Sequence, residues 1–394
     1  MRRVGTVARG IRTPIIKEGD DLVKIVVDSV LKAAEIENFV IKNRDIIGVT
    51  EAVLAISEKN YATVDQIAFD ISRKFPKGVT GVVFPTPVSR NRFGNILKGI
   101  ARGSKKIYLQ FSFPHDEVGN SLFDENLLEK HNISVTDKID EKKYVEIFGS
   151  ETHIFTGINY YEYFKELVEN EGCEIEFIFS NDPLEILNYT KCVLVASVHS
   201  RFKIKKLFSG KTEILFGLDD ILNESVKNSG YHEKYGLLGS NKSTEEKVKL
   251  FPRTGETFVN AVQKEIYNKT KKEVEVLIYG DGAFRDPVGH IWELADPVVS
   301  PAYTAGLIGT PNELKLKYLS DNKFNELRGE ELTQAIKEEI KHKSKDLKAK
   351  AESQGTTPRQ LTDLIGSLCD LISGSGDKGT PIVYIQGYFD NYAD

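Results

Sequence analysis

The sequence has few cysteines and no long apolar run. Cys173, Cys192 and Cys369 stand far apart among 394 residues. Their odd number and wide spacing exclude a disulfide framework and give no zinc pattern, so we expect a reducing compartment. No apolar run approaches the roughly 20 residues that a membrane helix needs, and the first residues lack a signal peptide's apolar stretch. The prediction is therefore a cytoplasmic protein with no membrane contact.

An excess of positive charge is also missing. The formal net charge of −5 argues against a general nucleic-acid binder, although it leaves room for a local basic pocket. A hydrophobic content of 40% and a charged content of 28% are those of a globular protein. The length allows two or three domains with large cores, and we find no internal repeat.

One stretch organises the rest of the chain. Val274 to Tyr279 has the β-branched and aromatic residues of a short buried strand, and Gly280-Asp281-Gly282 ends it in a tight turn. The pattern places Asp281 at the carboxyl end of a strand, where open α/β sheets bind their ligands.

More carboxylates follow this turn. Asp286, Glu293 and Asp296 all come before Pro297. Several carboxylates around a glycine-rich turn suit a hard cation such as Mg²⁺, which takes few protein oxygens and leaves room for phosphates. The alternative is a Gly-Asp-Gly bend that only turns the chain and is hydrated.

Two arginines form a second candidate site. Arg90 and Arg92 fall in the first turn of a predicted helix that Ser89 would cap. Cations oppose the helix dipole there, so an anion held by the arginines and the free N–H groups is one interpretation. Surface arginines paired with nearby acids are the other. The cluster from His115 to Glu117 and His199 at a strand end are weaker candidates, which an ordinary solvated turn or loop explains better.

The remaining pattern predicts a mixed α/β fold. A helix is expected to about Ile36, and a strand from Asp45 that runs into Glu51-Ala-Val-Leu-Ala. Strands and helices alternate over 144–217, as in a parallel βαβ layer. The charged stretch 330–352 is predicted to be one helix, and Thr357-Pro358 to begin another before a last strand at 381–386.

Read together, these stretches resemble the coenzyme F-420 γ-glutamyl ligase family. Ile15 to Leu22 is similar to the opening of that family, and Ser240-Asn241 resembles its Ser-Asn loop motif. From Pro252 a helix and a strand lead to Asp281, which falls on the family's metal-binding aspartate, and Arg285 on the arginine after it. The late helix from Leu361 and the final strand also match.

The sequence departs from the family at three places. Gly236-Leu237-Leu238 stands where the family has a metal carboxylate before the Ser-Asn pair, and Gly282 replaces a threonine after Asp281. Ala55-Ile56 replaces a Ser-Lys pair, although Ser57 to Lys59 lies close by. The resemblance implies a γ-glutamyl-ligase-like mixed sheet from residues 1–60 and 235–394, with 61–234 as an inserted α/β region that changes the substrate.

The resemblance implies a specific chemistry. Family members join L-glutamate to a carboxylate acceptor through an acyl phosphate, using GTP or ATP and Mg²⁺ or Mn²⁺. Asp281 would be the main metal ligand, with Asp286 or Asp296 replacing the absent one, and Arg285 would neutralise phosphate charge. Ser240, Asn241 and the glycines 280 and 282 would lie against the nucleotide. Arg90 and Arg92 would hold an acidic acceptor.

Two other functions remain open from the residues. Leu238, Gly282 and Ile56 favour a relative that has lost catalysis and binds a nucleotide or a protein partner. An amide ligase of the same mechanism could instead act on a folate or a peptide-like acid. Family members resemble intertwined dimers, so the resemblance also implies a homodimer.

Overall fold

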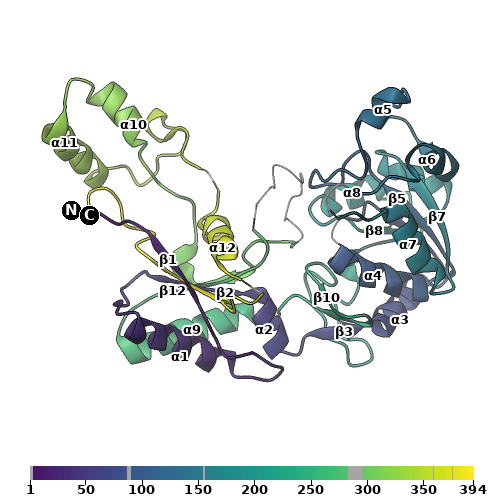
Figure 1. Ribbon diagram of the computed structural model, residues 1–394, viewed down its shortest axis with the longest axis horizontal. Coiled ribbons are helices and arrows are strands. Elements are labelled where there is room, and N and C mark those ends of the chain that lie inside the picture. The colour runs from purple at the N-terminus through teal and green to yellow at the C-terminus, as the bar shows by residue number, and fades with distance from the viewer. Residues whose placement is uncertain (1–2, 87–89, 154–155, 283–295, 358, 375) are drawn as a thin grey trace.

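The chain folds into two lobes that lie side by side (Figure 1). The computed structural model describes residues 3–86, 90–153, 156–282, 296–357, 359–374 and 376–394, with the backbone alone for 90–92. Each lobe is built on its own sheet, and a third, small sheet lies between them. The predicted mixed α/β class is confirmed.

The first lobe holds a five-stranded sheet in the order β1-β14-β2-β12-β13. Strands β2 and β12 run parallel, whereas every other neighbouring pair in this sheet is antiparallel. This is the mixed sheet that the sequence predicts. The strands are β1 (Val7–Ile11), β2 (Ile46–Thr50), β12 (Glu275–Tyr279), β13 (Ala302–Tyr303) and β14 (Ile382–Gln386).

Both faces of this sheet are covered. In β12, Val276 and Ile278 pack toward helices α1 (Leu22–Ile36) and α9 (Gly255–Thr270), while Leu277 and Tyr279 pack toward α12 (Leu361–Ile372). A strand covered on both sides is mostly apolar, which is why 276–279 reads as a continuous hydrophobic run.

The second lobe holds a six-stranded sheet in the order β6-β7-β5-β4-β8-β9. All its neighbouring pairs are parallel except the edge pair β6–β7. The predicted parallel layer over 144–217 is thus half of a larger sheet. Its strands are β4 (Val79–Val83), β5 (Lys106–Phe111), β6 (Ile139–Asp140), β7 (Glu174–Phe179), β8 (Cys192–Val195) and β9 (Ile214–Gly217).

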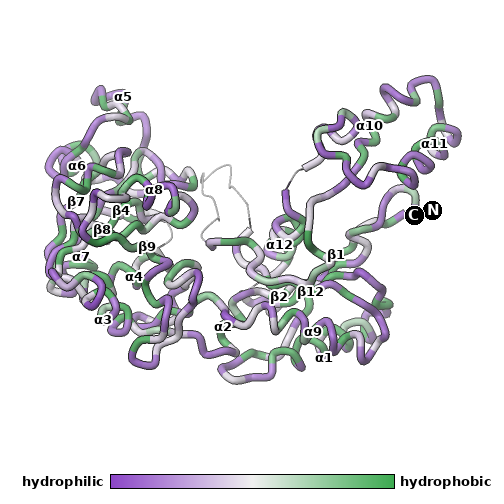
Figure 2. Tube along the Cα trace, turned by 180° about the vertical axis from the view of Figure 1, so that it is seen from behind, coloured by the Kyte–Doolittle hydropathy of each residue, from purple (hydrophilic) through white to green (hydrophobic). Residues whose placement is uncertain are grey.

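Helices cover both faces of the second sheet as well. One face packs on α3 (Val64–Lys74), α4 (Arg90–Arg102) and α7 (Tyr160–Glu169), and the other on α8 (Arg201–Phe208). The view from behind shows the central strands in the hydrophobic colour (Figure 2). Helices α5 (Asn126–Lys130) and α6 (Glu141–Phe148) lie at the far end of this lobe.

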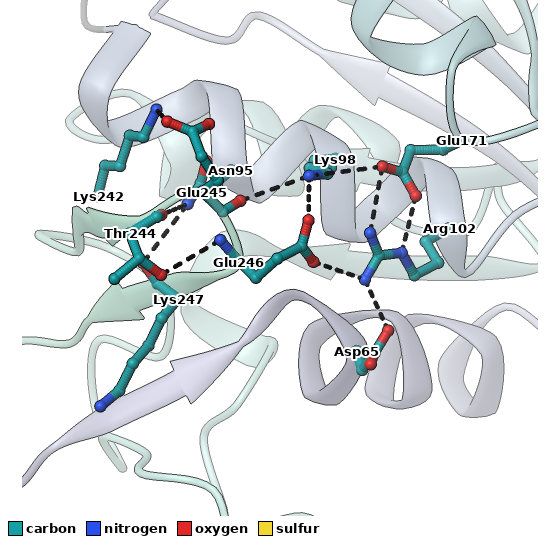
Figure 3. Close-up of polar contacts among 10 residues, drawn as sticks. All are labelled: Asp65, Asn95, Lys98, Arg102, Glu171, Lys242, Thr244, Glu245, Glu246 and Lys247. Carbon is teal, nitrogen blue, oxygen red and sulfur yellow. Dashed lines mark hydrogen bonds and ion pairs between the residues drawn. The ribbon is translucent and has the colours of Figure 1, made fainter.

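The small sheet joins the two lobes. It contains β3 (Tyr61–Thr63), β10 (Asn241–Thr244) and β11 (Lys247–Lys249), in the order β10-β11-β3. Figure 3 shows how the β10–β11 turn is tied to α4: Arg102 bridges Glu246 at 2.9 Å and Glu171 at 2.7 Å, and Asn95 donates to the Thr244 carbonyl at 2.9 Å. These contacts hold the small sheet to the second lobe.

Three segments differ from the sequence prediction. Glu51 to Ser57 forms helix α2 and does not extend the strand, because Glu, Ala and Leu favour helix and Leu54 faces the core. Helix α11 (Gly329–Lys341) ends well before residue 352, since its apolar spacing stops after Ile340. Helix α12 begins at Leu361, after an N-cap at Gln360. The short helix α10 (Leu316–Tyr318) packs near α11 in an extension of the first lobe.

The largest hydrophobic cluster runs from Ala62 to Phe251. It includes Leu237, Leu238 and Leu250, so residues on both sides of the predicted boundary at 234/235 share one core. The predicted division of the chain stays a prediction. Among the described residues, no helix is long and apolar enough to cross a membrane.

Candidate active site

The ends of the parallel strands β2 and β12 bring two candidate segments together. Thr50 lies opposite Tyr279 in the register of this pair, so both strands finish at the same edge. Glu51 follows β2 directly, and Gly280-Asp281-Gly282 follows β12. This edge is where the sequence predicts a ligand site, and Glu51 is a residue that the prediction missed.

Two further carboxylates hold the Gly-Asp-Gly turn. The N–H of Asp281 donates to Oδ2 of Asp296 at 2.7 Å, and the N–H of Gly282 donates to Oδ2 of Asp370 at 2.9 Å. Hydrogen bonds from N–H groups to charged acceptors are short and comparatively strong. The turn is therefore fixed by acids from two distant segments, and it leaves Asp281 half-buried at the edge of the sheet.

The glycine at 280 is required by this packing. A Cβ built there would lie 2.2 Å from Oδ2 of Asp296, far closer than real carbon–oxygen contacts. Asp296 is itself only 3% exposed, so its carboxylate has little room to retreat. The absent side chain lets the buried carboxylate reach the backbone of Asp281.

A buried ion pair completes the edge. Nζ of Lys249, on β11, lies 3.0 Å from Oε1 of Glu51, with side-chain exposures of 9% and 5%. A buried pair of this kind is held by mutual neutralisation, because each charge has been removed from water. The pair links the small sheet to the first lobe and places a cation beside the Glu51 carboxylate.

The Ser-Asn pair lies on the same side of the molecule. Asn241 is the register partner of Lys249, whose amine binds Glu51. A Cβ at Gly239 would lie 3.0 Å from Cδ of Pro297, so the loop before Ser240 touches the residue after Asp296. The two predicted groups therefore meet where the lobes join.

The Ser240 side chain has an unusual environment. Ser240 is 1% exposed, and within the described chain its hydroxyl has no hydrogen-bond partner. A buried hydroxyl without a partner costs free energy. A ligand atom at this hydroxyl would remove that cost.

Several predicted site residues cannot be placed. Arg285, Asp286 and Glu293 lie outside the described residues. Arg90 and Arg92 fall in the first turn of α4, as predicted, but their side chains are outside the described part. The other predicted residues, Ser240, Asn241, Gly280, Asp281, Gly282 and Asp296, are brought to the junction of the lobes.

The carboxylates do not form a compact metal centre. In the part of the chain that the structure describes, no group of three His, Cys, Asp or Glu side chains is arranged to hold a metal ion. Leu238, at the position of the family's metal carboxylate, is 2% exposed and packs in the second lobe's core. The described residues alone therefore do not make a three-ligand site.

Glu51, Lys249 and Asp370 were missed because they come from three separate segments. Nothing in their local sequence marks them: Glu51 opens a short helix, Lys249 shares β11 with Lys247, and Asp370 shares α12 with Asp363. Their only signal would have been the pairing order of the strands. Glu51 could have been found from its position directly after β2, once β2 had been paired in parallel with β12.

Comparison with known proteins gives a family for the chain. A family model described as F420-0:Gamma-glutamyl ligase matches residues 10–387. The match covers both lobes, including the predicted insertion. A search of curated proteins found no match.

Proposed function

The chain belongs to the F420-0:gamma-glutamyl ligase family, and from that premise we propose that it is a nucleotide-dependent amide ligase. It would join L-glutamate to an acidic acceptor through an acyl phosphate, with GTP or ATP as cosubstrate. The observation that carries the proposal is the shared edge of β2 and β12, where Glu51, Asp281 and Lys249 converge.

The chemistry explains why charged groups gather at this edge. Forming an acyl phosphate is phosphoryl transfer, in which catalysis consists mainly of positioning and charge neutralisation. Asp281 is the proposed ligand of Mg²⁺ or Mn²⁺, with Asp286 or Asp296 beside it, and the bound metal would neutralise triphosphate charge. Asp296 also accepts the Asp281 N–H, so it orients the turn.

The other predicted residues take supporting roles. Ser240 and Asn241 are proposed to contact the nucleotide phosphates, since the buried Ser240 hydroxyl is open to a ligand acceptor or donor. Arg285 would neutralise phosphate charge, and Arg90 and Arg92 would bind the acceptor acid. A homodimer is implied by the family resemblance and stays a prediction.

The test is nucleotide binding by Asp281→Asn. Isothermal titration with GTP or ATP and Mg²⁺ should show at least tenfold weaker binding, because the substitution removes the charge that attracts the metal. The matched control is Asp321→Asn, which removes an exposed carboxylate from the extension of the first lobe and should change nothing. Equal nucleotide binding by wild type and Asp281→Asn would overturn the assignment.

A second function is favoured by Leu238. The burial of this leucine in an apolar core, in place of a metal carboxylate, suits a relative that binds a nucleotide or partner without catalysis. Release of phosphate or nucleoside diphosphate that depends on glutamate and an acidic acceptor separates the two. Nucleotide binding with no turnover across a broad acceptor screen would favour the binding protein.

A further inference from the structure

The second lobe has a ligand position of its own. Its parallel strands stand in the order β7-β5-β4-β8-β9, which is third, second, first, fourth and fifth along the chain. The direction of winding reverses between β4 and β8. In open α/β sheets, ligands bind in the crevice outside the carboxyl ends of the two strands at such a reversal.

A pocket lies at this point. It is lined by residues that follow β4, β8 and β9, among them Thr86, Ala196, Val198 and Leu218, and by the loop that ends at Ser240. The side chains of Phe93 and Leu238 make its wall largely apolar. The space in it is small, so only a compact group fits.

The polar atoms at this pocket lack partners. Within the described residues, the buried hydroxyl oxygens of Thr86 and Ser240 make no hydrogen bond. Ser197, between the lining residues Ala196 and Val198, is fully buried and its hydroxyl is also unpaired in the described structure. Buried hydroxyls are normally satisfied, so the two that line this pocket, those of Thr86 and Ser240, point to a polar ligand there.

An internal carboxylate occupies the turn beside the pocket. The Glu117 carboxylate accepts hydrogen bonds from the N–H groups of Val198, of His199 at 3.1 Å and of Ser200 at 2.9 Å. The Ser200 hydroxyl adds a fourth at 2.7 Å. We call the three N–H groups of residues 198–200 the β8–α8 nest. Successive N–H groups before a helix attract anions.

The nest and the pocket share Val198. Val198 donates its N–H to Glu117 and also lines the pocket. Arg201, which is 6% exposed, donates to the carbonyl of Val198 and pairs with Asp219 at 3.3 Å, so its charge behind the nest is already balanced. A ligand with its acid group in the nest would extend its body into the pocket.

We propose that the β8–α8 nest and the adjoining pocket bind a small oxyacid, with a carboxylate or phosphate head and a compact body that carries a hydroxyl. Glu117 occupies the head-group position until the ligand displaces it. The site lies at the β4–β8 edge and shares only Ser240 with the proposed nucleotide site. The substitutions that test it, at Glu117 and Thr86, have no role in the ligase proposal, so its failure would leave that proposal standing.

The experiment compares Glu117→Gln with wild type. Isothermal titration uses three probes: inorganic phosphate, benzoate and 4-hydroxybenzoate. Removing the competing charge should tighten binding of the preferred probe at least tenfold. The control is Glu125→Gln, which removes an exposed carboxylate of the same loop that binds His115 and Ser121; its affinities should equal those of wild type.

The outcomes separate the parts of the proposal. A gain for phosphate alone or for the benzoates alone identifies the head group, whereas equal affinities in all three proteins overturn the site. If Glu117→Gln does not fold by circular dichroism, Glu117→Asp, which shortens the reach to the nest, is compared in the same way.

Thr86→Val tests the pocket. It keeps the shape of the side chain and removes a hydroxyl that has no partner among the described residues. In the Glu117→Gln background, 4-hydroxybenzoate should bind several-fold more tightly than benzoate. Adding Thr86→Val should remove this preference and leave phosphate binding unchanged. A preference that survives Thr86→Val and the absence of any preference would each overturn the role given to the hydroxyl.

Discussion

The parallel strands of the two large sheets end among different kinds of side chain. At the β2–β12 edge of the first lobe, acids from separate segments gather around a glycine turn, and a buried lysine neutralises one of them. At the β4–β8 edge of the second lobe, a single carboxylate, Glu117, satisfies three N–H groups beside an apolar pocket.

The first edge is therefore a charged site, whereas the second edge suits a ligand that has a neutral body and one charged end. Among the described residues at the first edge, carboxylates outnumber the cation that pairs with them, which suits a polyanionic ligand that brings its own cations. The second edge has backbone N–H groups that already bind a carboxylate, and hydroxyls with no partner within the described part of the chain, which suit a smaller acid. A single substitution can disturb each edge. The sizes of the resulting changes in stability and binding test whether the two edges differ as described.

The largest effect is expected from Lys249→Met. It leaves the buried Glu51 carboxylate without its cation, and breaking a buried pair in this way costs about 3–5 kcal/mol of unfolding free energy. Urea unfolding measures the loss. If the first edge is held by this neutralisation, Glu51→Gln together with Lys249→Met should recover much of the stability, because no charge is then left buried.

The matched control is Lys24→Met. Lys24 pairs with Asp28 on α1, with side chains 71% and 44% exposed. Water already solvates both partners there, so no measurable change is expected. A loss for Lys249→Met as small as that of the control would show that the Glu51–Lys249 pair does not stabilise the first edge.

The two edges also differ in how much of each could be predicted from the sequence. The β12 strand and its turn are contiguous, so their residues alone indicated a ligand position at Asp281. Asp370 reaches that turn from α12, and Lys249 reaches Glu51 from β11; only the packing of segments far apart in the chain brings them to this edge. The partners of Glu117 lie some eighty residues away, and three of the four are backbone N–H groups, which leave no mark in the sequence.

An intermediate effect is expected at the second edge from Asp116→Asn. Burial raises the pKa of Asp116 to about 6 from an ordinary 3.8, against the hydrogen bonds from Val118 and Asn120 that favour its charged form. Between these two values the folded state binds more protons than the unfolded state. Stability from this group is therefore highest below about pH 4 and falls until about pH 6.

The asparagine removes this dependence. Relative to wild type, Asp116→Asn should gain up to about 3 kcal/mol between pH 4 and pH 7, since each pKa unit corresponds to about 1.4 kcal/mol. Thermal unfolding of both proteins across this range measures the difference. If the difference in stability between the two proteins stays constant with pH, burying the charged Asp116 carboxylate costs nothing. The loop that carries Glu117 is then not destabilised by this charge.

The smallest effect is expected from Gly280→Ala, which returns to the first edge. The added Cβ must push the Asp296 carboxylate away from the Asp281 N–H, and overpacking of this kind costs about 1–3 kcal/mol. Gly5→Ala, where a Cβ meets nothing within 4 Å, is the control. Because Asp296 orients the turn, Gly280→Ala should also weaken nucleotide binding. Unchanged nucleotide affinity in a destabilised protein would show that the turn packs against Asp296 without presenting Asp281 to a ligand, and the two edges would then differ in structure alone.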